Sequence, residues 1–424
     1  MSADAKRRSF GGAAHKAIYT LGTLCLIAMA VYYALSFFFE AGYTPLGNFG
    51  APVVAKYAEG DRVYLLTGQW RTYTPRGQGR SGRMTTYFHV DLWAIDAATA
   101  KPLWRKRLES ERGGGYGDRS LMGVHGNTVW LKIRRHIVAV SALDGSVLLK
   151  SGKLEEGNAE LRGLMPTEDR YFTFDGRGLL ITAADARQWR IDPDTFKALP
   201  VAPDTPPDPR AYPPVYYTPN GTQLHMVRGV ETAERWLGMM TDNEAKFFEE
   251  HNNLGDSYND DRRRIWSARI VKQSTFFGEQ PDYVDVSPVP GTADYLGGKF
   301  LREYDRASQL PAIRIGEPDS VLLLSRERLG QAGKLRLARL SVIDGRVLWD
   351  TQLPLTEVQS VRRLDSTVVI LGIEYTEGDP EVTDPLRDSP RRLVALDLAS
   401  GAVRHFSFSA LETHPEAAKI NAGL

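Results

Sequence analysis

Two glycine-rich stretches have the composition of nucleotide-binding loops. Residues 77–82 (GQGRSG) match GxGxxG, in which the glycines let a backbone approach a pyrophosphate where a strand leads into a helix. The residues that follow, TTYFHVDLWAID, have the pattern of a strand, which favours a hairpin loop. Residues 111–118 (ERGGGYGD) lack the Gly-Lys-Ser/Thr of a phosphate loop and are interpreted as a loop as well.

Several side chains could bind ions, but none stands at diagnostic spacing. His89, His125 and His136 could form a zinc site if their strands were neighbours; core or surface histidines are favoured because no close pair exists. The acidic run 256–261 lacks EF-hand order and three arginines follow it, which favours surface charge over calcium binding. The arginines between 76 and 83 could bind an anion or simply be solvated. We assign no catalytic residue, no metal and no cofactor.

Cys25 is the only cysteine, and it lies within the most apolar stretch of the chain. The rest of the protein therefore has no disulfide, no cysteine nucleophile and no thiolate metal ligand. Charge is also uninformative about nucleic acid, since 53 basic residues balance 52 acidic ones. We expect no nucleic-acid partner.

The apolar stretch, residues 17–39, predicts a transmembrane anchor. It contains no charged residue, and at about 1.5 Å of helical rise per residue it would span about 35 Å. Residues 1–16 form a basic arm that should stay cytoplasmic by the positive-inside rule. Bulky residues stand where a signal peptidase needs small ones, so an uncleaved signal-anchor is favoured over a cleaved signal peptide.

This topology predicts a single-pass protein of the bacterial inner membrane with its main domain in the periplasm. A Gram-positive cell exterior is the alternative compartment. Residues 40–50 are expected to be a linker, and residues 411–424 a C-terminal tail.

A sequence motif such as LWAIDAATAKPLW (92–104) recurs along the chain, for example as VAVSALDGSVLLK (138–150) and ARLSVIDGRVLWD (338–350). Alignment of the copies gives three columns. The first holds Asp or Ser, the second lies three residues later, and the third follows directly. The columns are Asp96, Ser141, Asp192, Ser341 and Asp397; Thr99, Asp144, Thr195, Asp344 and Ser400; Ala100, Gly145, Phe196, Gly345 and Gly401.

Each copy predicts a β-hairpin. An apolar strand comes first, the Asp or Ser side chain then starts a turn, and Gly supplies the positive φ that closes it. We expect Gly345 to have positive φ. A second strand follows, and in two copies it includes a tryptophan, Trp104 and Trp349, which we expect to be buried between repeats.

Another strand precedes each hairpin, as in EGDRVYLLTG (59–68) and LDSTVVILGI (364–373). Such short antiparallel strands in each period are the content of a propeller blade. The sequence therefore predicts an all-β protein, a β-propeller of about seven (six to eight) four-stranded blades over residues 51–410. The long gap between the third and fourth copies has room for degenerate blades, and Asn220-Gly221 there suits a hairpin turn.

The columns, followed by Trp, resemble the repeats of pyrroloquinoline-quinone-type β-propellers, the quinoprotein alcohol dehydrogenase-like group, over roughly residues 52–200 and 320–408. With its anchor, the chain also resembles uncharacterised inner-membrane-anchored proteins of Gram-negative bacteria. The group includes quinone-dependent dehydrogenases and non-enzymatic scaffolds such as the propeller lipoprotein of the outer-membrane protein assembly machine. The resemblance implies the fold and leaves the activity open. Many of the dehydrogenases hold the quinone against a disulfide of adjacent cysteines, which this chain lacks.

Residues 231–255 (ETAERWLGMMTDNEAKFFEEHNNLG) interrupt the repeat, and we expect a helical insertion. A first helix would cover 231–240, and a capping box of Thr241 and Glu244 would open a second that ends at Gly255.

The insertion is the candidate surface for a partner, with Trp236, Met240, Glu244 and Phe247 as its candidate residues. Apolar residues at i+3 and i+4 favour packing for most of them, so Trp236 is expected to be largely buried. The acidic face, Glu244 with Glu249 and Glu250, is expected to be exposed.

Together these features predict a membrane-anchored propeller that binds another envelope protein as a scaffold, without catalysis. A quinone-dependent dehydrogenase of the same fold is the alternative, and a receptor for a small ligand is a third reading.

Overall fold

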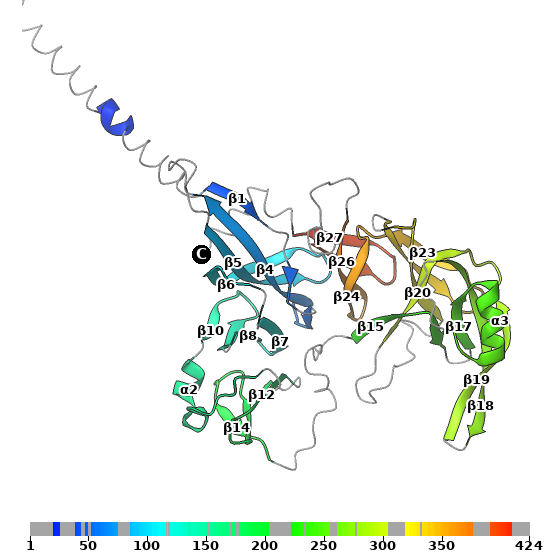
Figure 1. The fold of residues 1–424 in the computed structure, drawn as a ribbon, viewed down its shortest axis with the longest axis horizontal. Coiled ribbons are helices and arrows are strands. Elements are labelled where there is room, and N and C mark those ends of the chain that lie inside the picture. The colour runs from blue at the N-terminus through cyan, green and yellow to red at the C-terminus, as the bar shows by residue number, and fades with distance from the viewer. Residues whose placement is uncertain are drawn as a thin grey trace, which may run out of the picture. The chain divides into compact units, whose positions relative to one another are not determined.

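The computed structural model is mostly β (Figure 1). The chain divides into two compact units. Unit 1 comprises Met1–Thr44, Gln69–His89 and Glu109–Gly115, and unit 2 the remainder. The structure describes residues 20–25, 39–43, 47–49, 52–74, 85–115, 117, 119–134, 136–150, 152–168, 171–174, 178–202, 222–232, 235–254, 261–275, 278–303, 319–330, 333–375 and 391–408.

Four-stranded antiparallel meanders account for most of the described strands, and we name them sheets A to F in chain order. Further strand pairs, among them β18 with β20, join sheets D, E and F into one 13-stranded sheet. Sheet A contains β3 (Val53–Ala55), β4 (Arg62–Thr74), β5 (Thr85–Asp96) and β6 (Pro102–Arg112). Sheet B contains β7 (Arg119–His125), β8 (Thr128–Ile133), β9 (His136–Ser141) and β10 (Val147–Leu149). Sheet C contains β11 (Phe172–Phe174), β12 (Leu179–Thr182), β13 (Gln188–Ile191) and β14 (Ala198–Pro200).

The second half of the chain repeats this pattern. Sheet D contains β16 (Gly229–Glu231), β17 (Arg235–Met240), β18 (Arg262–Thr275) and β19 (Gly278–Pro288). Sheet E contains β20 (Tyr295–Glu303), β21 (Ser320–Arg326), β22 (Leu335–Ser341) and β23 (Val347–Gln352). Sheet F contains β24 (Glu357–Arg363), β25 (Thr367–Ile373), β26 (Arg391–Asp397) and β27 (Val403–Ser407).

A few elements stand outside the meanders. β15 (Thr222–Val227) pairs with both β20 and β24, and β1 (Phe39–Tyr43) and β2 (Gly47–Asn48) pair with β4. The helical segments, besides a helical turn over residues 20–25, are α2 (Lys153–Gly157), the 3-10 turn η1 (Ala159–Leu161) and α3 (Asp242–His251).

The cores of unit 2 lie between pairs of sheets, and each pair buries apolar side chains from both partners. Sheets B and C share one cluster, D and E a second, and E and F a third. Sheets A and B are joined by polar contacts, since Arg62 and the Tyr64 hydroxyl both donate to the Ala142 carbonyl oxygen, at 2.9 and 3.0 Å.

The first sheet of the chain also packs against the last. Val54, Leu65 and Trp93 of sheet A share a cluster with Leu371 of β25 and Phe408, which follows β27. Polar contacts accompany this core: Lys56 pairs with Asp365 at 2.7 Å, and Arg404 donates to the Ala98 carbonyl oxygen at 3.0 Å. Sheets A and F are thus held together by residues that lie more than 300 positions apart in sequence.

The repeated turn has the predicted geometry in all five copies. The third-column residue has a left-handed backbone in each, with φ of +57° at Ala100, +75° at Gly145, +56° at Phe196, +68° at Gly345 and +71° at Gly401. Its N–H donates to the carbonyl oxygen of the first-column residue, at 2.9 to 3.1 Å. Ala100 and Phe196 adopt this conformation without being glycine. The position in the turn therefore determines the backbone conformation more strongly than the residue type does.

The side chains form two variants of this turn. In the Asp variant, both the N–H and the hydroxyl of Thr195 donate to Asp192, at 2.7 Å each. In the Ser variant the carboxylate acceptor is the second-column residue instead of the first. The Asp344 carboxylate accepts from the Arg346 N–H at 3.2 Å. The hydrogen bonds from Thr195 hold the pKa of Asp192 below its usual value, and hydrogen bonding led by Ser341 does the same for the pKa of Asp344.

The tryptophans of the repeat contact the turn of the next sheet. The Trp104 ring lies over Gly145, where a Cβ would come within 2.8 Å of it, and the indole Nε1 donates to the Ala142 carbonyl oxygen at 3.3 Å. Trp349 lies over Gly401 in the same way. Its Nε1 donates to a carbonyl oxygen, that of Leu398, at 3.0 Å. Both tryptophans are half-buried, whereas the sequence predicted that both would be buried between repeats.

The N-terminal region is described in part. Residues 20–25 are helical, but within the described part of the chain no helix is long and apolar enough to cross a membrane. Phe39, the expected last residue of the anchor, begins β1. The expected linker 40–50 contains most of β1 and all of β2. The basic arm 1–16, Asn220-Gly221 and the tail 411–424 lie outside the described residues.

The contact between Trp349 and Gly401 predicts a non-additive pair of substitutions. Gly401→Ala should lower the free energy of unfolding by about 2 kcal/mol, because it adds both left-handed strain and a clash with the indole ring. Trp349→Ala should lower it by about 2 to 4 kcal/mol. In the Trp349→Ala background the cost of Gly401→Ala should fall to about 1 kcal/mol, since only the backbone strain remains. Urea unfolding measures all three.

Ala100→Gly is the matched control for the backbone term. It relieves a left-handed alanine but removes a buried methyl group, so stability should change by less than about 1 kcal/mol. Additive costs in the Gly401 and Trp349 pair would contradict the proposed contact.

Candidate functional site

Helix α3 departs from the repeat, and its first turn is fixed by local sequence. The Thr241 hydroxyl accepts from the Glu244 N–H at 3.2 Å, while the Glu244 carboxylate accepts from the Thr241 N–H at 2.8 Å. This confirms the predicted capping box. The helix ends at His251 and not near Gly255, because Asn252 takes the left-handed conformation of a C-cap, with φ of +55°.

The first expected helix, residues 231–240, is wrong. Glu231 ends β16, and 235–240 form β17, which pairs with both β16 and β18. On β17, Leu237 and Met239 face sheet E, while Trp236 and Met240 face α3. A strand buried on both faces has an unbroken apolar run, which a helical pattern can mimic.

An aromatic cluster seats α3 on sheet D. The rings of Trp236 and Phe248 stack with centroids 4.2 Å apart, and Tyr283 packs beside both. The predicted burial of Trp236 is confirmed, at 5% exposed, although it lies on a strand; Met240 is fully buried. Neither is available to a partner.

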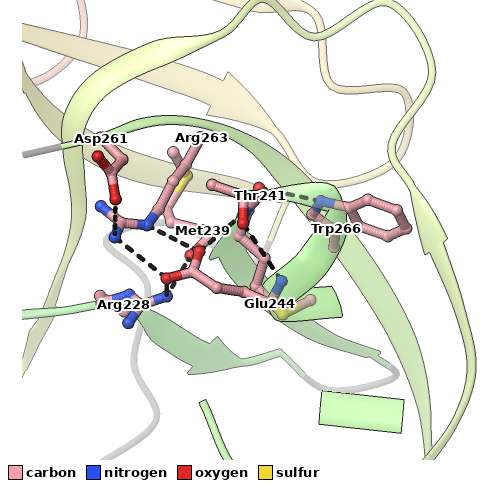
Figure 2. Close-up of polar contacts among 8 residues, drawn as sticks. Arg228, Met239, Thr241, Glu244, Asp261, Arg263 and Trp266 are labelled. Carbon is pink, nitrogen blue, oxygen red and sulfur yellow. Dashed lines mark hydrogen bonds and ion pairs between the residues drawn. The ribbon is translucent and has the colours of Figure 1, made fainter. Parts of the chain in front are cut away.

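Charged contacts fix the other side of α3 (Figure 2). The Glu244 carboxylate accepts from Arg263 Nε at 2.9 Å and pairs with Arg228 at 2.8 Å. Arg263 is nearly fully buried, and its guanidinium also lies 3.5 Å from Asp261. Trp266 Nε1 donates to the Met240 carbonyl oxygen at 3.1 Å, which ties the chain entering α3 to β18. Glu244 is therefore a half-buried structural group, which corrects the expectation that it belongs to an exposed acidic face.

The electrostatics of Glu244 follow from this geometry. Burial alone would raise the pKa of its carboxyl group. The hydrogen bonds from Arg263 and the Thr241 N–H, with the charges of Arg228 and Arg263, outweigh burial and hold the pKa below its ordinary value. The ionised carboxylate is thus the form that holds the N-terminus of α3 in place.

The C-terminal end of α3 is also fastened. Asn252 donates to the Asp282 carboxylate, and its side-chain oxygen accepts from the Tyr283 N–H at 3.3 Å. The Tyr283 hydroxyl donates to Glu231 at 2.5 Å, and burial followed by this contact raises the pKa of Tyr283 well above its usual value. Helix α3 is held at both ends and across its buried face.

The outward side of α3 presents Phe247, Glu249 and Glu250 to solvent. Phe247 is 45% exposed and stacks on His251, with ring centroids 4.2 Å apart. Of the four candidate partner residues only Phe247 is exposed. Glu250, three residues later, lies on the same side of the helix, whereas Glu249, two residues later, lies on a different side. We call Phe247, Glu249, Glu250 and His251 the outer face of α3.

Of the other candidate sites, only the histidines lie within the described residues. His89 belongs to unit 1, and His125 and His136 to unit 2. No group of three or more His, Cys, Asp or Glu suited to a metal occurs among the residues that the structure describes. Residues 77–82 and 256–260, and the arginines between 76 and 83, lie outside those residues.

Sequence reasoning missed a buried ion pair cluster in sheet A. Asp91, almost fully buried, pairs with Arg105 at 2.5 Å and with Arg107 at 2.9 Å. Burial opposes ionisation, but the two arginines outweigh it and lower the pKa of Asp91. Arg105 also lies over the Trp93 ring at 4.7 Å. The only indication in the sequence was that Arg105 and Arg107, two residues apart, lie on the same face of a strand. This spacing does not show which acidic residue they contact.

Comparison with models of known protein families and with functionally characterised proteins finds no match to this chain.

The Glu244 contacts predict a pH-dependent loss of stability. Glu244→Gln should lower the free energy of unfolding at pH 7 by about 2 to 4 kcal/mol, because it leaves two largely buried arginines without a carboxylate. The folded-state pKa lies below that of the unfolded chain, so the stabilisation is present above about pH 4.5 and is lost as the pH falls through the folded pKa. Unfolding curves from pH 7 to 3 should show the two proteins converge in acid.

Glu249→Gln is the matched control, since Glu249 is exposed on the same helix; its effect should stay within about 0.5 kcal/mol. An equal cost for both variants would show that the Arg228 and Arg263 contacts do not stabilise the fold.

Proposed function

We propose that this protein is a membrane-anchored β-propeller that acts as a binding scaffold for another protein of the bacterial envelope, in the periplasm. Four-stranded meanders that pack in series support the propeller, and so does the core shared by sheets A and F, because a ring of blades needs its first and last blades to meet. The charge-free stretch 17–39 supports the anchor.

The outer face of α3 is the observation that carries the binding role. An exposed aromatic ring, with the carboxylate of Glu250 about one turn away, lies on a helix whose other sides are fixed by stacking, ion pairs and caps. A rigid helix loses little conformational entropy when it binds, so it suits recognition by a partner. An aromatic residue such as Phe247 is typical of the centre of a protein interface.

The binding role predicts a loss of partner recovery. Phe247→Ser with Glu249→Lys and Glu250→Lys should reduce partner protein recovered by crosslinking from membranes at least fivefold relative to the wild type, because it removes the ring and reverses the charge. The melting temperature should stay nearly unchanged, since all three side chains are exposed.

Ile343→Ser is the control, because Ile343 is more exposed, at 76%, and lies in the turn of sheet E. It should leave recovery intact. Equal recovery from the triple variant and the wild type would argue against this surface. Saturable binding of pyrroloquinoline quinone with calcium, together with dye reduction by an alcohol or sugar, would replace the scaffold with the dehydrogenase alternative.

The anchor predicts the orientation of the chain. A phosphatase that is active only outside the cytoplasm, fused after Leu424, should be active in intact cells. The same fusion with Lys6, Arg7 and Arg8 changed to Glu should lose much of this activity, because the basic arm sets the orientation. Activity confined to a cytoplasmic reporter would contradict both the compartment and the orientation.

A further inference from the structure

Strands β18 and β19 continue past the rest of sheet D as a two-stranded ribbon (Figure 1). The pairing of β18 with β17 ends at Arg269, whereas its pairing with β19 runs on to Thr275 opposite Gly278. We call the part from Val271 to Thr275 and from Gly278 to Asp282 the sheet D ribbon. Among the residues that the structure describes, no other strand pairs with it. Each long edge of such a ribbon is a pairing site for a further strand unless it is blocked.

The β19 edge of the ribbon is blocked. The Tyr283 N–H donates to the side chains of Asn252, at 3.3 Å, and Asp282, at 3.0 Å, so it points away from β18. The backbone of Pro281, two residues earlier, faces the same way and has no N–H to donate. Farther along β19 the register shifts and Asp285 has a φ of +59°, a bulge that bends the edge away from a partner. An incoming strand therefore finds no free N–H at Tyr283 or Pro281.

The β18 edge of the ribbon is open. Lys272 lies opposite Pro281, and Ser274 lies opposite Glu279. These pairs are in phase with Tyr283 and its partner, so the N–H and C=O groups of Lys272 and Ser274 point away from β19. Both residues are exposed, and within the described residues nothing bonds to these backbone groups. Their spacing along the strand matches that of another extended chain.

The charges at the two edges differ in sign. Arg269 and Lys272, on β18, have side chains that are 62% and 77% exposed. Their acidic partners, Asp285 at 3.0 Å and Glu279 at 3.3 Å, both lie on β19. The open edge is therefore basic and the blocked edge acidic. A lysine on an open edge disfavours an apolar or basic strand beside it and favours an acidic one.

We propose that the β18 edge of the sheet D ribbon binds an extended, acidic segment of another protein by strand addition. The inference goes beyond the binding role of the outer face of α3 and does not depend on it. The backbone groups of Lys272 and Ser274 supply the hydrogen bonds, and the charges of Arg269 and Lys272 select the segment. A third strand also stabilises a ribbon that two strands alone hold weakly.

Hydrogen exchange on the full chain tests the proposal, with mass-spectrometric fragmentation that resolves single amides. The probe is a synthetic peptide of alternating glutamate and valine, and its control has lysine in place of glutamate. The glutamate peptide should slow exchange at Lys272 and Ser274 by at least about tenfold and leave the Glu279 amide unchanged. The lysine peptide should bind at least about fivefold more weakly.

Ser274→Pro and Glu279→Pro are a matched pair of variants, because the two residues lie opposite each other and each loses an N–H on a different edge. Pro281 shows that the ribbon accommodates proline at such a position. Ser274→Pro should weaken binding of the glutamate peptide at least about fivefold, and Glu279→Pro should leave it unchanged, as measured by fluorescence anisotropy. If circular dichroism shows that Ser274→Pro alters the fold, Lys272→Glu replaces it and should remove the preference for the glutamate peptide.

Three results would overturn the proposal. The first is unchanged exchange at Lys272 and Ser274 with millimolar glutamate peptide, or equal binding of the two peptides. The second is slowed exchange at Glu279 instead, which would place the added strand on the β19 edge. The third is slowed exchange that rises with protein concentration without peptide, which would replace the partner segment with a second copy of this chain.

Discussion

The contact between one sheet and the turn of the next is the constraint on which unit 2 depends. A four-stranded meander buries little on its own, so its faces must be covered by neighbours. At the turn of sheet B, a left-handed residue without a Cβ leaves room for the Trp104 ring, and the indole N–H satisfies a turn carbonyl. Trp349 does the same at sheet F. One residue in each of these turns, Gly145 or Gly401, therefore satisfies two requirements. It adopts the left-handed backbone conformation of the turn, and it leaves space for a tryptophan from the preceding sheet.

The remaining turns meet the same constraint with other side chains. At sheet E, a Cβ on Gly345 would meet Val289 and Thr292, which follow β19 of sheet D. At sheet C, the bulk lies on the turn itself, where Phe196 packs against Trp130 with ring centroids 5.8 Å apart. The volume at each junction is filled either by the turn or by the neighbouring sheet, so a glycine is needed only where side chains of the neighbour pack against the turn.

Local features of the fold were predictable, and pairings distant in sequence were not. The turn columns follow from side-chain and φ preferences within six residues, so Asp192 or Gly345 could be interpreted without knowledge of neighbours. The sequence RWLGMM misled because apolar residues on both faces of β17 satisfy a helical pattern as well. Asp91 and Glu244 could not be paired with their arginines, since a charge in a sequence does not say which distant charge it meets. The same limit applied to the candidate surface: spacing identified the insertion but not that Met240 is buried and Phe247 exposed.

Helix α3 shows how an insertion can change what a repeated sheet does. One face of sheet D packs against sheet E, just as sheet E packs against sheet F. Its second face carries α3, which joins β17 to β18 and brings its own aromatic partner, Phe248. A helix at this position needs more stabilising contacts than a sheet does. It buries only a narrow apolar stripe, and its two ends have unpaired backbone groups. The capping box, the Glu244 ion pairs and the Asn252 contacts provide this stabilisation. What sheet D presents on this side is therefore the outer face of a rigid helix, with side chains that the repeat does not specify.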